Sequence, residues 1–148
     1  MKAPDERCGA ASGAIDVLAR TIYGEARGET VRGKEAVAAV VMNRLRRATG
    51  QPRRFGAGHT VESICRQPYQ FSCWNAADAN RPVIERVKAG DAPFDCCVRI
   101  ATRAVRNILA DPTGGATHYH AIGAWPNWAS GRTPAVIIGR HVFYKEID

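Results

Sequence analysis

Apolar residues recur every three or four positions through the first two-thirds of the chain, the spacing that places them on one face of a helix. Ile15, Leu18 and Ile22 show this spacing and predict a first helix at about residues 13–27, with Ser12 as its N-cap. The same period predicts further helices at about residues 31–48, 60–65, 82–89 and 96–110, with Thr30, Thr60 and Asp95 before or at their starts.

The last third of the chain has a different pattern. Residues 116–121 are predicted to form a strand, and residues 136–144 a hairpin or bent strand pair around Gly139 and Arg140. Residues 49–59 have the composition of a loop. Helices followed by a small C-terminal antiparallel β-sheet indicate an α+β fold with a mainly helical core.

The length of 148 residues suits one domain, and no linker, repeat or low-complexity segment divides it. We expect a polar N-terminal lead over residues 1–12 and a single catalytic domain over residues 13–148. No run approaches the ~18 apolar residues of a membrane helix, and no secretory signal is recognisable at the N-terminus. A substrate outside the cytoplasm would therefore require another delivery route, such as a phage holin or a virion, unless a signal has been removed.

The chain is basic, with a net charge of +7. A basic surface attracts polyanions, which include nucleic acid, anionic lipid and bacterial wall polymers. No zinc finger, aromatic RNA-binding signature or heptad repeat is present, so nucleic-acid binding is not predicted. Much of this charge lies in three groups of basic residues: Arg44, Arg46, Arg47, Arg53 and Arg54; Arg81, Arg86 and Lys88; Arg99, Arg103 and Arg106.

The five cysteines lack the spacing of a structural zinc site. In an oxidising compartment, Cys65 or Cys73 could pair with Cys96 or Cys97. Buried free thiols are the alternative, because cysteine packs as a small apolar residue.

One carboxyl stands out for its chemical setting. Glu25 lies among small and apolar neighbours at the end of the first predicted helix, so we expect partial burial to raise its pKa. A carboxylic acid protonated near neutral pH is suited to cleaving a glycosidic bond. Gly24 and Gly28 leave room for another group to approach. The alternative is a solvated surface glutamate that, with Glu29, is balanced by Arg27.

Polar and aromatic clusters interrupt the predicted elements, and such positions often carry function. Aromatic faces stack on sugar rings, while Gln and Asn bind hydroxyl and acetamido groups. The loop setting of Trp125 and Trp128 favours a binding rim, whereas Phe71, Trp74 and Phe143 fit a core. The clusters cover residues 23–29, 67–75 and 117–128.

Three histidines support a second hypothesis. His118 and His120 share one face of a strand, and His141 on a neighbouring strand could add a third zinc ligand, with Glu25 as general base. That site would make the protein a zinc amidase or peptidase. Neutral histidines that only form structural hydrogen bonds are the alternative. No cysteine has a setting that favours a nucleophile.

Read together, these clusters resemble the SleB/CwlJ-type cell-wall hydrolases. The resemblance covers about residues 15–144, and its separate motifs occur in the order of the family. The motifs are residues 18–29, 36–44, 67–75, 111–120 and 138–144.

The resemblance implies a lysozyme-like core that cleaves the β-1,4 bond between N-acetylmuramic acid and N-acetylglucosamine, with Glu25 as the catalytic acid. In a lytic transglycosylase this acid then takes the proton of the muramic C6 hydroxyl. A hydrolase would usually need a second carboxylate, for which Glu29, Asp95 and Asp111 are the candidates. None has an equally persuasive motif, so the route with a single acid is favoured.

The resemblance also implies substrate contacts. Gln70 and Ser72 would bind substrate and orient Glu25, and aromatic residues would shape the sugar subsites. The expected partner is the peptidoglycan glycan strand, bound by a monomer with no cofactor, no nucleic acid and no stable membrane insertion. Relatives in sporulation carry an added peptidoglycan-binding domain, so a stand-alone lysin, perhaps from a phage, is expected here, with a non-catalytic wall-binding module as a further alternative. The expected substrate-binding residues are Tyr23, Glu29, Gln70, Ser72, His118, Tyr119, His120 and Trp125.

Overall fold

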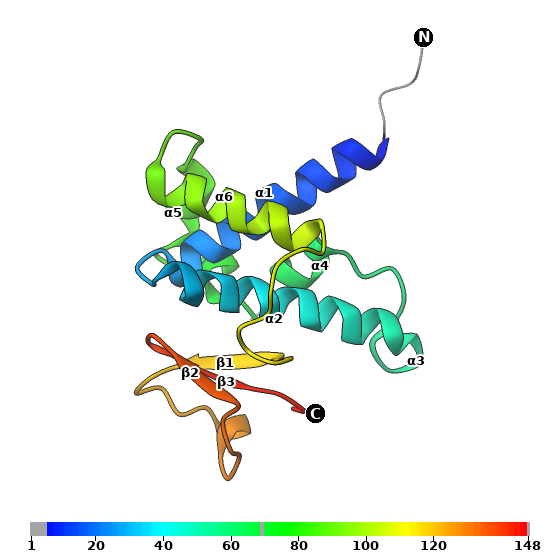
Figure 1. Ribbon diagram of the computed structural model, residues 1–148, viewed down its shortest axis with the longest axis vertical. Coiled ribbons are helices and arrows are strands. Elements are labelled where there is room, and N and C mark those ends of the chain that lie inside the picture. Colours follow the sequence, from blue (N-terminus) through cyan, green and yellow to red (C-terminus); the bar gives the residue numbers. More distant parts are fainter. Residues whose placement is uncertain (1–5, 69, 148) are drawn as a thin grey trace.

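The computed structural model describes residues 6–68 and 70–147, and it places a helical layer on a small sheet (Figure 1). Tyr69, in the predicted 67–75 cluster, lies outside the described residues. The helices are α1 (Glu6–Ala26), α2 (Val31–Gly50), α3 (Pro52–Phe55), α4 (Val61–Arg66), α5 (Arg81–Arg86) and α6 (Ala92–Val105), with short 3-10 turns η1 (Ser72–Trp74) and η2 (Asn127–Ala129). The strands are β1 (His118–Ala121), β2 (Val136–Ile138) and β3 (His141–Tyr144). The α+β prediction is confirmed.

The first helix begins earlier than predicted. Helix α1 starts at Glu6, so Ser12 lies inside the helix and the prediction of Ser12 as its N-cap is wrong. After Pro4 the sequence has no proline until α1 has ended, and one serine among alanines is a weak stop signal.

The other helix ends show which capping signals were read correctly. Thr30 caps α2 by accepting the Gly33 N–H, and Thr60 forms a capping box with Ser63 before α4. Helix α6 differs from the prediction, because Asp91 rather than Asp95 accepts the N–H of Phe94 and starts the helix four residues earlier. Helix α6 also ends early. Asn107 has a positive φ of 60°, a left-handed conformation that stops a helix. A short helix, α3, occupies part of the predicted 49–59 loop.

The three strands form an antiparallel sheet in the order β1-β3-β2. Strands β2 and β3 form the predicted hairpin, and Gly139 in its turn has a φ of +57°. In β1–β3, Tyr119 pairs with Phe143 and His120 with Val142. Because side chains alternate along a strand, Tyr119 and His120 point to opposite faces of the sheet.

Each face of the sheet packs against a different part of the chain. The inner face lies on α2, where Phe143 and Ile138 contact Ala36 and Val40. The outer face, with Tyr144, is covered by Trp128, Ala129 and Ile147. A larger core joins α1, α2, α4 and α6 through buried side chains that include Leu18, Ile22, Val41, Ile64 and Ile100.

Cys65, Cys73, Cys96 and Cys97 are free thiols, so the structure has the second of the two cysteine arrangements considered above. Burial raises the pKa of Cys65 and of Cys97 to about 12. Thiols with such pKa values are poor nucleophiles, which agrees with a packing role. None of the described helices combines the length and the apolar composition that a bilayer crossing needs.

Candidate active site

The last turn of α1 carries Glu25 into a partly enclosed position between η1 and β1. Burial raises the pKa of Glu25 above 4.5, hydrogen bonding from Cys73 and Tyr119 offsets part of the rise, and the charge of Asp78 adds to it. Its atom Oε1 is buried, with no hydrogen-bond partner among the described residues. An enclosed oxygen without a donor disfavours negative charge, so the protonated acid is favoured.

A glycine brings η1 against this turn of the helix. A Cβ at Gly24 would lie 2.7 Å from Cβ and 2.9 Å from Sγ of Cys73, closer than real side chains come. The indole Nε1 of Trp74 also donates to Thr21 Oγ1 at 2.9 Å inside the core. The close approach predicted for Gly24 is therefore made by η1, while a Cβ at Gly28 would meet nothing within 4 Å.

Tyr119 reaches Glu25 because α2 holds the segment that leads into β1. Asn43 Nδ2 donates to the carbonyl of Ala116 at 2.9 Å, and Arg44 Nε donates to that of Thr117 at 2.6 Å. Burial and the nearby charge of Glu25 raise the pKa of Tyr119 well above 10, so its hydroxyl stays protonated and can donate. Tyr119, which was predicted only as a substrate contact, is thus a hydrogen-bond partner of Glu25.

Glu29 lies in the turn after α1 and faces the β-hairpin. Its Oε1 accepts the backbone N–H of Arg140 at 2.9 Å and lies 3.6 Å from Nδ1 of His141. Arg27 contacts other groups, since it stacks on Tyr23 and donates to Asn80 Oδ1 at 2.8 Å. The structure therefore gives Glu29 a positioning role.

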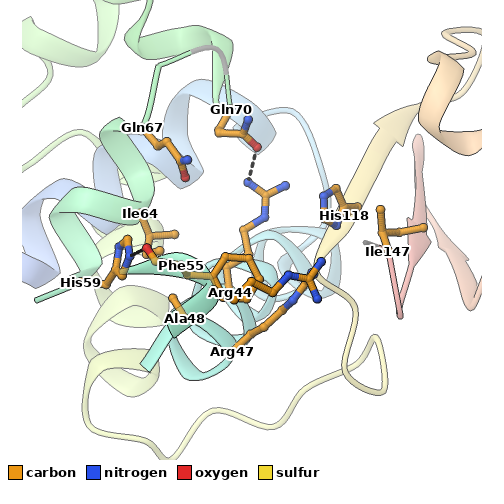
Figure 2. Close-up of a pocket in the computed structure, with 11 residues that line it drawn as sticks. Arg44, Arg47, Ala48, Phe55, His59, Ile64, Gln67, Gln70, His118 and Ile147 are labelled. Carbon is orange, nitrogen blue, oxygen red and sulfur yellow. Dashed lines mark hydrogen bonds between the residues drawn. The ribbon is translucent and has the colours of Figure 1, made fainter. Parts of the chain in front are cut away.

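Gln70 and His118 border a pocket that Arg44 also lines (Figure 2). Gln70 Oε1 accepts a hydrogen bond from Arg44 Nη1 at 3.2 Å. Arg44 stacks on Phe71. Burial lowers the pKa of Arg44, whereas the negative charge of Glu25 acts to raise it, so the two groups interact electrostatically. Ser72 is exposed at the start of η1.

Three of the expected substrate contacts lie elsewhere. Tyr23 packs edge-on against Phe94 of α6, with ring centroids 5.9 Å apart. His120 lies on the outer face of the sheet, bonded to the Tyr144 hydroxyl at 2.9 Å, and the exposed Trp125 stacks beside it. These three side chains are not gathered around Glu25.

The histidines do not form the zinc site considered above. His118 and His120 lie on the outer face of the sheet, whereas His141 pairs with Ala121 and packs on Tyr119 at the inner face. Residues 6–68 and 70–147 contain no group of three His, Cys, Asp or Glu side chains placed to hold a metal ion. The zinc hypothesis fails because strand alternation separates its ligands.

Asp95 and Asp111, two candidates for a second catalytic carboxylate, accept hydrogen bonds from neighbouring groups. Burial raises the pKa of Asp111, but hydrogen bonds from Asn43, Thr113 and Gly115 lower it overall. Asp95 accepts the N–H of Gly90. The acid that acts electrostatically on Glu25 is Asp78, which the motifs did not single out. The sequence indicated Asp78 only by its position, as an acidic residue just beyond the 67–75 motif.

Comparisons with known proteins identify relatives over most of the chain. The family model described as Cell Wall Hydrolase matches residues 28–144, beginning just after Glu25. The spore cortex-lytic enzyme of Halalkalibacterium halodurans is 32% identical over 96% of this chain and 38% of its own length. That of Oceanobacillus iheyensis is 33% identical over 88% of this chain and 41% of its own. The chain thus spans about two-fifths of the length of these curated relatives.

Solved structures show the same fold. The catalytic domain of the Bacillus cereus SleB protein superimposes with a TM-score of 0.68 at 27% identity, covering 90% of this chain and 91% of that domain. The catalytic domain of the germination-specific lytic transglycosylase SleB from Bacillus anthracis gives 0.66 at 28% identity, covering 89% and 93%.

Proposed function

This chain belongs to the Cell Wall Hydrolase family, and from that premise we propose that it cleaves peptidoglycan glycan strands between N-acetylmuramic acid and N-acetylglucosamine. The observation that carries the proposal is the setting of Glu25. Its carboxyl is held between α1, η1 and β1, its pKa is raised by burial, and its Oε1 has no donor among the described residues. Such an acid stores the proton that a leaving glycosidic oxygen needs.

The proposed reaction uses one carboxyl twice. Glu25 protonates the bridging oxygen as the bond to muramic C1 breaks, which frees the N-acetylglucosamine end and leaves an electron-poor C1. Ionised Glu25 then removes the proton of the muramic C6 hydroxyl while its oxygen bonds to C1. The product is a 1,6-anhydro sugar, and no water is consumed. The relative from Bacillus anthracis is named a lytic transglycosylase, which supports this route.

The surroundings of Glu25 favour this route over hydrolysis. A hydrolase needs a second carboxylate, typically ~5–9 Å away, to activate water or act as nucleophile. Glu29, Asp95 and Asp111 each accept backbone N–H groups instead. Tyr119 would hold Glu25 in position and Ser72 would contact substrate. Gln70, which accepts a hydrogen bond from Arg44, would also contact substrate.

The product chemistry tests the proposal. Purified sacculi are digested with the protein and the soluble fragments are analysed by mass spectrometry. Anhydro-muropeptides are expected. New reducing ends would show hydrolysis by a second group, freed stem peptides would show an amidase, and binding without release would show a wall-binding module.

The proposal extends to where and how the protein acts. We place its substrate in the cell wall, and we expect a monomer. Light scattering of the purified protein at working concentration tests the oligomeric state.

A further inference from the structure

The pocket bordered by Gln70 and His118 has a volume of about 230 Å³ and lies between α2, the α3–α4 region and β1 (Figure 2). Three arginines line it: Arg44, Arg47 and Arg54. The described residues that line it include no acidic side chain. The pocket therefore has the electrostatic character of an anion site.

The pocket is also partly apolar. Ala48, Phe55, Ile64 and Ile147 contribute to its lining. The guanidinium groups of Arg47 and Arg54 each lie 4.9 Å from the centre of the Phe55 ring. Cationic groups held on an aromatic ring beside aliphatic side chains suit a ligand with both carboxylates and short apolar side chains.

His118 adds no positive charge to the pocket at neutral pH. Burial and the charges of Arg44, Arg47 and Arg132 together lower the pKa of His118 to about 4. At neutral pH the imidazole is therefore uncharged and can accept a hydrogen bond. Thr117 Oγ1 lies 3.0 Å from its Nδ1.

Arg44 connects the pocket to the reacting acid. Its Nε donates to the carbonyl of Thr117, two residues before Tyr119, and its Nη1 donates to Gln70 at the pocket edge. Its charge also interacts with Glu25 and Tyr119. A group bound against Arg44 and Arg47 would therefore lie beside the sugar whose bond Glu25 cleaves.

We propose that this pocket binds the carboxylate-bearing peptide stem attached to muramic acid, so that the enzyme selects strands that carry stems. The proposal rests on the proposed function, because it needs a glycan strand at Glu25. Of the two sugars in the strand, only muramic acid carries the lactyl group that bears a peptide. Stem recognition would also fix which sugar lies on each side of Glu25.

The test compares two forms of one substrate. Glycan strands from a single preparation are used intact or after an amidase has removed their stems, and kcat/KM is measured on both. Wild-type protein is expected to prefer intact strands by about two- to fivefold, the range for partly exposed arginine–carboxylate contacts. Arg47→Ala and Arg47→Glu should lower this preference, with the larger loss for glutamate.

The control is Arg99→Ala, which removes an exposed arginine of α6 that lies outside the pocket and should keep the wild-type preference. Far-UV circular dichroism checks each variant for folding. If the Arg47 variants fail to fold, Arg54→Gln changes an exposed position of the same pocket.

Binding is measured separately by adding the released stem peptide to wild-type protein and following the His118 imidazole by NMR. A saturable shift that Arg47→Glu weakens supports the proposal. Equal shifts with inorganic phosphate at the same concentration would overturn it, as would equal kcat/KM on both strands. Failure to cleave either strand would instead overturn the proposed function on which it rests.

Discussion

Glu29 and Arg140 are joined by a hydrogen bond of 2.9 Å, from the backbone N–H of Arg140 to the side-chain Oε1 of Glu29. The contact links the turn between α1 and α2 to the turn of the β2–β3 hairpin. A Cβ at Gly139 would lie 2.6 Å from Glu29 Oε2, so a glycine there lets the hairpin reach the carboxylate. The two glutamates of the 21–29 motif thus differ in role, since Glu25 faces the site and Glu29 holds the sheet.

Replacing Glu29 should affect stability more than chemistry. Glu29→Ala removes the acceptor for the Arg140 N–H and should lower the free energy of unfolding by about 1–2 kcal/mol. Glu29→Gln keeps a carbonyl oxygen and should lose less than half as much. Urea denaturation gives both values. A well-folded Glu29→Gln protein whose turnover fell by orders of magnitude would place Glu29 in the reaction.

Two glycines of the same motif provide a matched pair of substitutions. Gly24→Ala forces a methyl group against Cys73 and Ile84, which should destabilise the protein by about 1–3 kcal/mol and shift η1 away from Glu25. Gly28→Ala points into open space and should change stability by less than about 0.5 kcal/mol. Thermal unfolding and kcat are measured for both. Equal effects would mean that η1 is not held by this approach.

Replacing Asp78 tests whether the reaction is transglycosylation by Glu25 alone or hydrolysis with a second acid. Its negative charge raises the pKa of Glu25, so Asp78→Asn should lower that pKa and move the alkaline limb of the kcat/KM profile to lower pH. Turnover at acidic pH should be nearly unchanged. A general base for water would behave differently, since its loss costs about 10²–10⁴-fold at every pH. Such a loss, with reducing-end products, would assign hydrolysis to Asp78.

His118 should stay neutral under working conditions. Its pKa is lowered to about 4 by burial and by three arginines, whereas an unfolded histidine titrates near 6.5. The unfolded chain therefore binds a proton first, and stability should fall as pH drops from 6.5 towards 4. His118→Gln should remove part of this fall. NMR titration of the imidazole checks the pKa, and a value near 6.5 would contradict the burial of this ring.

Helix and strand patterns in the sequence predicted the main elements because their apolar faces meet one large core. Leu18 and Ile22 of α1, for example, are both fully buried. Helix starts were harder to predict, because Ser12 and Asp95 are capping types that lie inside helices, and the backbone of neighbouring residues decides which one caps.

The site was predicted in part for a related reason. Glu25 and Tyr119 are in motifs that the fold brings together. The charge of Asp78 raises the pKa of Glu25, but the two residues are far apart in the sequence and no local pattern predicts that they interact. Strand alternation did carry one unused signal. His118 and Tyr119 are adjacent in β1, so they face opposite sides of the sheet, and His120 and Trp125 follow His118 to the outer face.

Glu25→Gln should separate the chemistry of this residue from its effect on stability. The variant cannot donate or accept the proton in the reaction, so turnover should fall by several orders of magnitude. In the wild type, burial raises the pKa of Glu25 above 4.5, which means that the folded protein binds this proton more tightly than the unfolded chain.

The sign of the stability change follows from this linkage. Wild-type stability should decline as pH rises from about 4.5 through the raised pKa, because ionised Glu25 is disfavoured in the fold. Glu25→Gln removes that decline, so it should be more stable than wild type at pH 7 and similar to it below pH 4.5. Urea denaturation across this range measures the difference. A variant that is less stable than wild type at neutral pH would contradict the raised pKa of Glu25. A variant that retains near-wild-type turnover would show that Glu25 is not the proton donor.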